Sequence, residues 1–186
     1  MAAVLNYRLK KSVAMVGMMG AGKTAVGTAV ARVLRVPFLD SDREIEKAAH
    51  MTIAEIFARD GEDFFRERET EVIERLLKTR RCILSTGGGA FLFERNRRII
   101  AEKGVAVWLR ADLDLLWSRV RHKTTRPLLR TADPRATLAE LYARRVPDYA
   151  KAEIIVDADP DFTVEQMADR VIAALATHPD VLEVSP

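Results

Sequence analysis

The sequence predicts a single α/β domain in which a parallel sheet is covered by helices on both faces. Short, mostly apolar runs alternate with longer segments of helical periodicity, which is typical of βαβ units. The chain has 186 residues, of which 48% are hydrophobic and 31% charged. A domain of about 100–200 residues with this balance can bury a substantial core. We therefore expect one soluble globular unit that spans residues 1–186.

Each element follows from its own local pattern. The predicted strands are Ser12–Gly17, Pro37–Asp40, Cys82–Thr86, Val105–Arg110 and Ile154–Asp157. The predicted helices are Thr24–Leu34, a helix that opens at Thr52 with capping-box spacing, Glu62–Lys78, Arg95–Lys103, Asp112–Arg121, Asp133 to about Tyr149, and Val164–Leu175. The connection from Arg121 to Pro134 is long, polar and basic. Long connections in compact domains are usually functional or disordered, so we expect a lid here.

Charge and cysteine usage exclude several classes of function. The 30 basic residues exceed the 27 acidic ones by only three and are spread among them, so no nucleic-acid partner is expected. Cys82 is the only cysteine, which excludes an intramolecular disulfide and favours a reducing, cytoplasmic setting. No run approaches the ~18 apolar residues of a membrane-spanning helix, and no secretory pattern is visible. We expect neither a membrane partner nor export.

The most informative motif is the glycine-rich run Gly17–Thr24, which fits GxxxxGK[ST] between a predicted strand and a predicted helix. Glycines let backbone N–H groups approach phosphate oxygens, and the helix N-terminus adds positive potential. We expect Lys23 to reach the β- and γ-phosphates of a nucleoside triphosphate, and the Thr24 hydroxyl to hold Mg²⁺. The expected nucleotide-binding residues of this P-loop are Gly20, Ala21, Gly22, Lys23, Thr24 and Ala25. The alternative is a glycine-rich turn with an incidental lysine.

Two carboxylates, Asp40 and Asp42, stand at the end of the second predicted strand. Ligands of parallel α/β sheets bind beyond the carboxyl ends of the strands, so this pair should face the same crevice as the P-loop. We expect the chain to be extended here and the two carboxylates to point to opposite sides. One would then face a metal's water shell and the other a substrate hydroxyl. The alternative is that Asp40, Ser41 or Asp42 merely caps the next helix.

Glycines and arginines suggest a second anion site. Gly87, Gly88 and Gly89 follow the third predicted strand and would expose N–H groups as a floor for a carboxylate. Arg66, inside a helix, and Arg145, before the proline expected to end its helix, can each clamp a carboxylate bidentately. Taken alone, each arginine also suits a solvated surface, and the glycines also suit a plain turn.

A basic residue in the Arg121–Pro134 segment would stabilise the charge of a phosphoryl-transfer transition state if it closed over the γ-phosphate. The alternative for this segment is a solvated loop. His122, between two basic residues, is expected to be exposed and is not assigned as a general base.

Together these motifs resemble the shikimate kinases, a family of small P-loop kinases of the nucleoside-monophosphate-kinase type. The matching segments are Gly17–Gly27, Phe38–Glu46, Ile53–Arg66, Gly87–Ala90, Arg126–Leu129 and Arg144–Tyr149, in family order from about residue 10 to 175. The P-loop is generic, but its combination with the other segments is specific. The resemblance implies a three-layer α/β/α fold with sheet order 2-3-1-4-5, a substrate-binding region at about 41–69 and a lid at about 121–134.

The resemblance also implies an activity, the ATP-dependent phosphorylation of the 3-hydroxyl of shikimate on the route to chorismate and the aromatic amino acids. ATP and Mg²⁺ would be required. Lys23 and Arg126 would contact the transferring phosphate, Thr24 the Mg²⁺ and Asp40 its hydration shell. Asp42 would orient or deprotonate the attacking hydroxyl.

The resemblance further implies contacts with the carboxylate of shikimate and with the adenine of ATP. Arg66 and Arg145 would bind the shikimate carboxylate together with Gly87, Gly88 and Gly89, and Arg119 would lie against adenine. Phosphoryl transfer depends mainly on alignment and charge neutralisation, so no strongly raised pKa is expected for Asp42. A monomer is expected. The first ten residues and the tail after about His178 match nothing in the family and are expected to be disordered ends.

Two other functions remain open at this point. Another small-metabolite kinase, such as a gluconate kinase, would share the P-loop and the architecture. A non-catalytic or nucleic-acid-associated P-loop module would use Lys78–Arg81, Arg95–Arg98 and Arg119–Arg126 as a basic surface. The complete acidic pair and the lid arginine favour a kinase, because a binding module needs neither.

Overall fold

A five-stranded parallel sheet forms the centre of the computed structural model, which describes residues 6–123 and 127–186. Its strands are β2 (Ser12–Val16), β3 (Phe38–Asp40), β4 (Ile83–Ser85), β5 (Gly104–Arg110) and β6 (Ile154–Asp157). They are ordered β3-β4-β2-β5-β6, which is 2-3-1-4-5 when counted along the chain. The predicted topology is confirmed. Every residue of the central strand β2 is buried, as expected of a strand covered on both faces.

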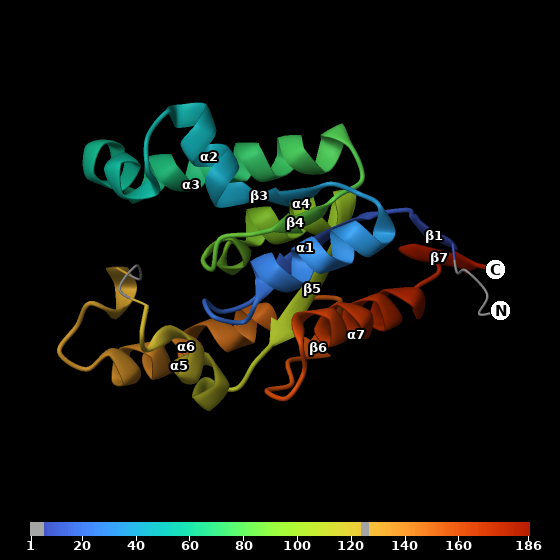
Figure 1. Ribbon diagram of the computed structural model, residues 1–186. Helices are drawn as coiled ribbons and strands as arrows, with labels where there is room; N and C mark the ends of the chain where they lie inside the picture. The colour runs from blue at the N-terminus through green and yellow to red at the C-terminus, as the bar shows by residue number, and fades with distance from the viewer. Residues whose placement is uncertain (1–5, 124–126) are drawn as a thin grey trace.

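Helices cover both faces of this sheet (Figure 1). They are α1 (Lys23–Leu34), α2 (Ser41–Ala49), α3 (Ile53–Thr79), α4 (Glu94–Lys103), α5 (Leu113–Val120), α6 (Pro134–Tyr149) and α7 (Val164–Ala176), with 3₁₀ turns η1 (Ala90–Leu92) and η2 (Pro127–Leu129). The helices α1 and α7 pack side by side on one face, and α4 packs on the other. This is the arrangement that right-handed crossovers on the two sides of β2 produce.

The long helix α3 joins two helices that the sequence predicts separately. Thr52 forms the expected capping box with Glu55, so the helix begins where the pattern indicates. Gly61 interrupts it with φ 83 and ψ 173, a backbone conformation that glycine adopts at low cost. The predicted start of a second helix at Glu62 therefore coincides with a real break.

Two local expectations were wrong. The residues after Asp40 are not extended, because α2 begins at Ser41 and places Asp42 in its first turn. Pro147 does not end α6, which continues to Tyr149 with the proline inside it. Proline removes one backbone donor from a helix, but Pro147 lies within the last turn of α6, where the loss is small.

Residues 6–9 and 182–185, close to the two ends of the chain, form strands, contrary to the expectation of disordered ends. β1 (Asn6–Leu9) pairs antiparallel with β7 (Leu182–Ser185), and Leu9 lies opposite Leu182. Both of these leucines are buried, and Lys11 forms a 2.7 Å ion pair with Asp180. Residues 1–5 lie outside the described residues. In Figure 1 this small sheet lies at the far end of the molecule from the loop between β2 and α1.

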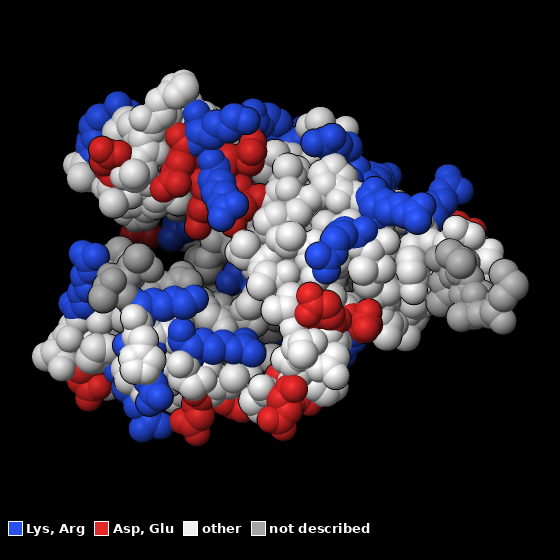
Figure 2. Space-filling model, viewed as in Figure 1, with Lys and Arg blue, Asp and Glu red and all other residues white. Residues whose placement is uncertain are grey.

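The surface is hollowed at the end of the sheet where the parallel strands terminate. Figure 2 shows this hollow between the part of the molecule formed by α2 and α3 and the part formed by α5 and α6, with basic side chains visible inside it. The P-loop and the residues after β3 and β4 lead into this region, as the rule for parallel sheets predicts.

Candidate active site

The P-loop folds around its own lysine. Lys23 Nζ donates to the backbone oxygens of Gly17, at 2.8 Å, and of Met18, at 3.0 Å. The backbone N–H groups of Gly22 and Thr24 donate to no acceptor in the part of the chain that the structure describes. They lie at the N-terminus of α1, where an anion is favoured. The predicted phosphate cradle therefore has its donors available.

Helix α5 supports this loop from outside. Arg119 Nη1 donates to the backbone oxygens of Gly20, at 3.1 Å, and of Ala21, at 3.2 Å. Gly20 has φ 82, and a Cβ there would lie 2.7 Å from a methyl group of Val120, so only glycine fits. The Arg119 guanidinium, assigned to adenine by the family resemblance, is here engaged with the P-loop backbone.

The two carboxylates after β3 have different surroundings. Asp40 is the N-cap of α2 and accepts a 3.1 Å hydrogen bond from the backbone N–H of Arg43. The alternative interpretation of this residue as a helix cap is thus realised. Asp42 lies two residues further along, in the first turn of α2, where the absent side chain of Gly87 leaves room for it: a Cβ on Gly87 would be 2.7 Å from Asp42 Oδ1.

Burial, followed by the repulsion of the neighbouring Asp40 carboxylate, raises the pKa of Asp42 from 3.8 to about 6. The positive charges of Lys23 and Arg66 act in the opposite direction. The expectation of no strongly raised pKa was wrong, because it considered what the chemistry requires and not how deeply helix α2 places this carboxylate. The Asp42 carboxylate is therefore close enough to the P-loop lysine and to an arginine of α3 for both charges to act on it.

The three consecutive glycines after β4 allow three functional side chains to approach the backbone. A Cβ on Gly88 would lie 3.1 Å from Arg145 Nη1, and one on Gly89 would lie 2.8 Å from Arg66 Nη2. With Asp42 against Gly87, each glycine meets a different predicted site residue. The structure therefore brings Asp42, Arg66 and Arg145 together around one loop.

Only two of the three glycine N–H groups are available to a ligand. The N–H of Gly87 donates to the Ser41 hydroxyl at 3.2 Å. The N–H groups of Gly88 and Gly89 meet no acceptor among residues 6–123 and 127–186. Gly87 therefore provides space for Asp42, and its two neighbours provide donors. The role of Ser41 was not found from the sequence, where it was considered only as a helix cap.

A buried carboxylate orients Arg66. Glu69 Oε2 lies 2.8 Å from Arg66 Nη1, and the Glu69 side chain is 1% exposed. The Glu69 Oε1 atom has no hydrogen-bond partner in the described residues, and burial raises the pKa of this carboxyl. The guanidinium also packs against the ring of Phe93, 4.9 Å from its centroid. Sequence reasoning missed Glu69, although its i,i+3 spacing from Arg66 was visible.

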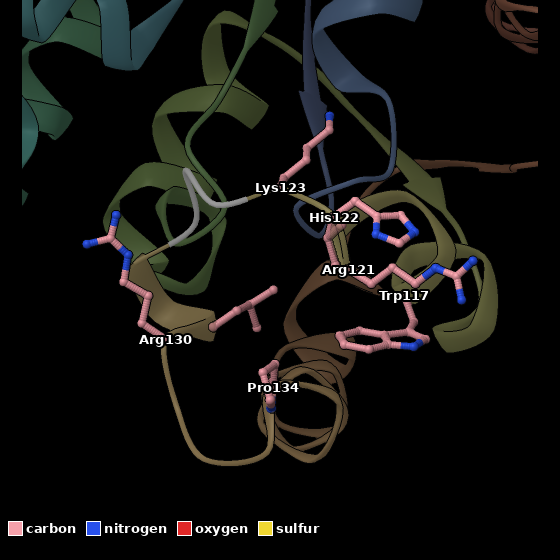
Figure 3. Close-up of a pocket in the computed structure, with 8 residues that line it drawn as sticks. Trp117, Arg121, His122, Lys123, Arg130 and Pro134 are labelled. Carbon is pink, nitrogen blue, oxygen red and sulfur yellow. The ribbon is translucent and has the colours of Figure 1, made fainter.

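The predicted lid is only partly described. Arg126, expected to contact the transferring phosphate, lies outside the described residues. The flanking segments form a partly open pocket of about 180 Å³, lined by Trp117, Val120, Arg121, His122, Lys123, Leu129, Arg130 and Pro134. Figure 3 shows Arg130 on the side of this pocket opposite Arg121. His122 is exposed, as predicted.

The oxygen donors near the P-loop suit a hard divalent cation. Thr24 follows Lys23 at the start of α1, and Asp40 keeps one carboxylate oxygen beyond the one that caps α2. Mg²⁺ usually takes one or two protein oxygens and completes its shell with water and phosphate, so this small donor set fits it. Within the described residues there is no group of three or more histidine, cysteine or acidic side chains that would hold a metal alone.

A parallel sheet of this order, a P-loop with available donors, and an acidic side chain beside two arginines define a P-loop kinase of a small acidic acceptor. A family model described as "Shikimate kinase" matches residues 19–176. The chain belongs to the shikimate kinase family.

Individual relatives agree with this placement. The shikimate kinase of Ruegeria pomeroyi is 68% identical over 177 residues, which cover 95% of this chain and 91% of that protein. That of Cereibacter sphaeroides is 68% identical over 176 residues, covering 95% and 88%. Among solved structures, shikimate kinase from Acinetobacter baumannii in complex with shikimate has a TM-score of 0.84 at 34% identity, covering 90% of this chain and 93% of that one. A gluconokinase from Sinorhizobium meliloti, at 19% identity and a TM-score of 0.61, shares the fold.

No helix in the described part of the chain combines the length and the apolar character needed to cross a membrane.

Proposed function

We propose that this chain transfers the γ-phosphoryl group of ATP to the 3-hydroxyl of shikimate, giving shikimate 3-phosphate. Membership of the shikimate kinase family supports this proposal. The observation that carries it is the position of Asp42, which lies against the same glycine loop as Arg66 and Arg145 and feels the charge of Lys23 in the P-loop. A hydroxylated acid held there would present a hydroxyl to the nucleotide and its carboxylate to the arginines.

Each side chain has a distinct task in this proposal. Lys23 and Arg126 stabilise charge on the transferring phosphoryl group. Asp42 accepts a hydrogen bond from the attacking hydroxyl and takes its proton as the oxygen–phosphorus bond forms and the bond to the ADP oxygen breaks. Arg66 and Arg145, with the N–H groups of Gly88 and Gly89, hold the carboxylate and so fix the ring.

A pKa of about 6 suits Asp42 to this task. The carboxyl is mostly ionised at neutral pH, yet it is more basic than an exposed aspartate with its usual pKa of 3.8. A base whose pKa lies nearer the working pH accepts a proton more readily in the transition state. Burial of the Asp42 carboxylate lowers the stability of the folded state, but it favours the proton transfer.

Mg²⁺ belongs to the same proposal. Thr24 would bind the ion directly and Asp40 would bind its water shell. When bound, the ion would neutralise charge on the β- and γ-phosphates. The cap hydrogen bond from Arg43 fixes the Asp40 carboxylate and leaves its second oxygen for that water shell. A chelator should therefore abolish turnover, and added Mg²⁺ should restore it.

The proposal also includes a monomer in a reducing, cytoplasmic setting. Cys82 is buried, and burial raises the pKa of its thiol, so it is not a reactive cysteine. Light scattering after size-exclusion chromatography tests the monomer directly, since a 20.9 kDa chain would elute as a species of twice that mass if it formed a dimer.

The activity is tested by measuring ADP production with shikimate, with gluconate and with no acceptor. We expect rapid ADP release only with shikimate. Gluconate is the discriminating control, because its carboxylate can also bind two arginines but its chain is flexible. Equal or faster turnover with gluconate, or stimulation only by a polynucleotide, would overturn the proposal.

A further inference from the structure

The last residue of α6, Tyr149, connects parts of the site that are far apart in sequence. Its side chain is fully buried, and its hydroxyl donates to the backbone oxygen of Gly88 at 2.5 Å. The same hydroxyl lies 4.0 Å from Met18 Sδ in the P-loop. Its ring packs 6.0 Å from that of Trp108, centroid to centroid. A phenol buried beside the glycine loop, with its hydrogen bond to the backbone of that loop, is positioned to control the geometry of the Gly88–Gly89 peptide.

The hydrogen bond to Gly88 fixes the orientation of a whole peptide unit. A trans peptide is planar, and its C=O and the following N–H point in opposite directions. With the Gly88 oxygen held by Tyr149 on the buried side, the N–H of Gly89 must point away from Tyr149. That N–H has no acceptor in the described part of the protein. The phenol thus directs a carboxylate-binding donor toward the hollow.

The Tyr149 hydroxyl also has a charged neighbour, one of the two arginines proposed to bind the carboxylate. The Arg145 guanidinium lies beside Tyr149 and opposes the effect of burial on the pKa of the phenol. Arg145 Nη1 also lies within 3.1 Å of the position that a Cβ on Gly88 would occupy. Because the hydroxyl proton points to the Gly88 oxygen, the oxygen lone pairs remain for a cationic neighbour. Tyr149 therefore meets the Gly88 carbonyl oxygen and the arginine at once.

We propose that Tyr149 is a positioning residue for carboxylate recognition, which aligns the Gly88–Gly89 peptide with the Arg145 guanidinium. This inference rests on the proposed function, since it names the residue that organises the carboxylate end of the acceptor. Because the Tyr149 side chain is fully buried, we expect it to touch neither the nucleotide nor the reacting hydroxyl. We therefore expect a defect in one substrate only.

Tyr149→Phe tests it, because this change removes the hydroxyl and keeps the buried ring. We expect the KM for shikimate to rise about five- to tenfold, corresponding to the loss of one net hydrogen bond, while the KM for ATP stays within about twofold. Tyr142→Phe is the matched control: it removes a hydroxyl from a half-buried tyrosine on the same helix, and both KM values should stay unchanged. A merely structural role would lower the melting temperature without this selectivity.

A double-mutant cycle with Arg145→Lys tests the coupling. If Tyr149 acts through Arg145, the two changes should raise the shikimate KM by less than the product of their single effects. Wild-type shikimate KM in Tyr149→Phe, equal rises in both KM values, or full additivity would overturn the role of Tyr149. Absence of shikimate-dependent turnover in the wild-type protein would instead overturn the proposed function itself.

Discussion

At the residue scale, Asp42 shows a conflict between stability and chemistry. The carboxyl is largely buried, its charge is disfavoured there, and its pKa is raised to about 6. A group whose pKa is raised by folding stabilises the folded state only while it is protonated, and that contribution is lost as the pH rises through 6. At neutral pH the charged Asp42 therefore opposes folding. Functional sites are where such local costs are expected.

Replacing this residue by a neutral isostere should separate the two effects. Asp42→Asn should lower kcat by at least about a hundredfold, since the acceptor for the hydroxyl proton is lost. At pH 8 it should also stabilise the protein by about 1–2 kcal/mol, because no charge is buried. Thermal unfolding from pH 8 to pH 4 measures this. The advantage of the variant should shrink as the pH falls through about 6 and the wild-type carboxyl takes up its proton.

The control is Asp63→Asn, which makes the same chemical change at an exposed position on α3. Both its activity and its melting temperature should match the wild type. A variant at position 42 that is active, or one that melts below the wild type at pH 8, would contradict this account of Asp42.

The pH dependence of turnover follows from the same group. Below about pH 6, kcat/KM for shikimate should fall tenfold per pH unit as Asp42 becomes protonated. Steady-state rates from pH 5 to pH 8 are sufficient to locate the acidic limb. If the limb lies near pH 4, Asp42 has the pKa of an ordinary exposed aspartate, and its proposed role as a tuned base is wrong.

The identities of the site residues could largely be predicted from the sequence, but their surroundings could not. Arg66, Arg145 and the three glycines are recognisable because their residue types suit a carboxylate. The roles of Glu69 and Tyr149 could not be predicted, because they depend on the burial of these side chains. That burial results from how α3 and α6 pack. The raised pKa of Asp42 was missed for the same reason.

At the scale of elements, α5 and the P-loop act as a unit. Arg119 holds the carbonyl groups of Gly20 and Ala21 toward α5. Planar peptides turn the following N–H groups the other way: that of Ala21 donates to the Met18 oxygen within the loop, and that of Gly22 has no acceptor in the described residues. The position of α5 therefore affects how well the loop binds phosphate. The two elements are far apart in sequence, since Arg119 and Gly20 differ by 99 in residue number.

Arg119→Met should weaken the binding of ADP and of inorganic tripolyphosphate by the same factor, about tenfold, because the loop that binds both is loosened. Isothermal titration calorimetry measures both affinities. Tripolyphosphate has no base, so it isolates the effect on the loop. Arg135→Met, which removes an exposed arginine paired with Asp114 of α5, is the control and should change neither affinity.

A loss of ADP affinity with unchanged tripolyphosphate affinity would contradict this account. That result would place Arg119 against adenine, as the family resemblance implies.

The elements themselves were predictable where a local signal existed. The capping box at Thr52 and the glycine at position 61 mark real boundaries of α3. The start of α2 was missed because an aspartate at the end of a strand suits both an extended chain and a helix N-cap. The prediction that Pro147 ends its helix was wrong because proline is tolerated when tertiary packing holds the surrounding helix.

At the scale of the whole molecule, the two ends of the chain meet at the far end from the site. The pairing of β1 with β7 joins residues separated by nearly the whole sequence, such as Asn6 and Ser185. No local sequence pattern predicts the pairing of β1 with β7, and strands of four residues are too short to be recognised from their alternation of polar and apolar residues. The topology of the central sheet was predictable because each of its crossovers is local and right-handed.

This separation predicts that stability and activity respond independently at the terminal sheet. Leu182→Ala should destabilise the protein by about 2–4 kcal/mol, because Leu182 is buried. Its kcat at a temperature where it remains folded should equal that of the wild type. Denaturant unfolding and steady-state kinetics measure the two quantities. Val184→Ala on the same strand, with a side chain 39% exposed, should cost less than about 1 kcal/mol.

A large fall in kcat for folded Leu182→Ala would show that the ends of the chain are coupled to the site. Equal destabilisation by the two variants would show that the packing of β7 differs from that described.

The most direct measurement is a crystal structure of the protein with ADP and shikimate bound together. The shikimate carboxylate should lie between the guanidinium groups of Arg66 and Arg145 and accept hydrogen bonds from the glycine loop. The 3-hydroxyl should lie within hydrogen-bond distance of Asp42 and face the nucleotide phosphates. Shikimate bound away from the arginines, or with that hydroxyl turned from Asp42, would contradict the account.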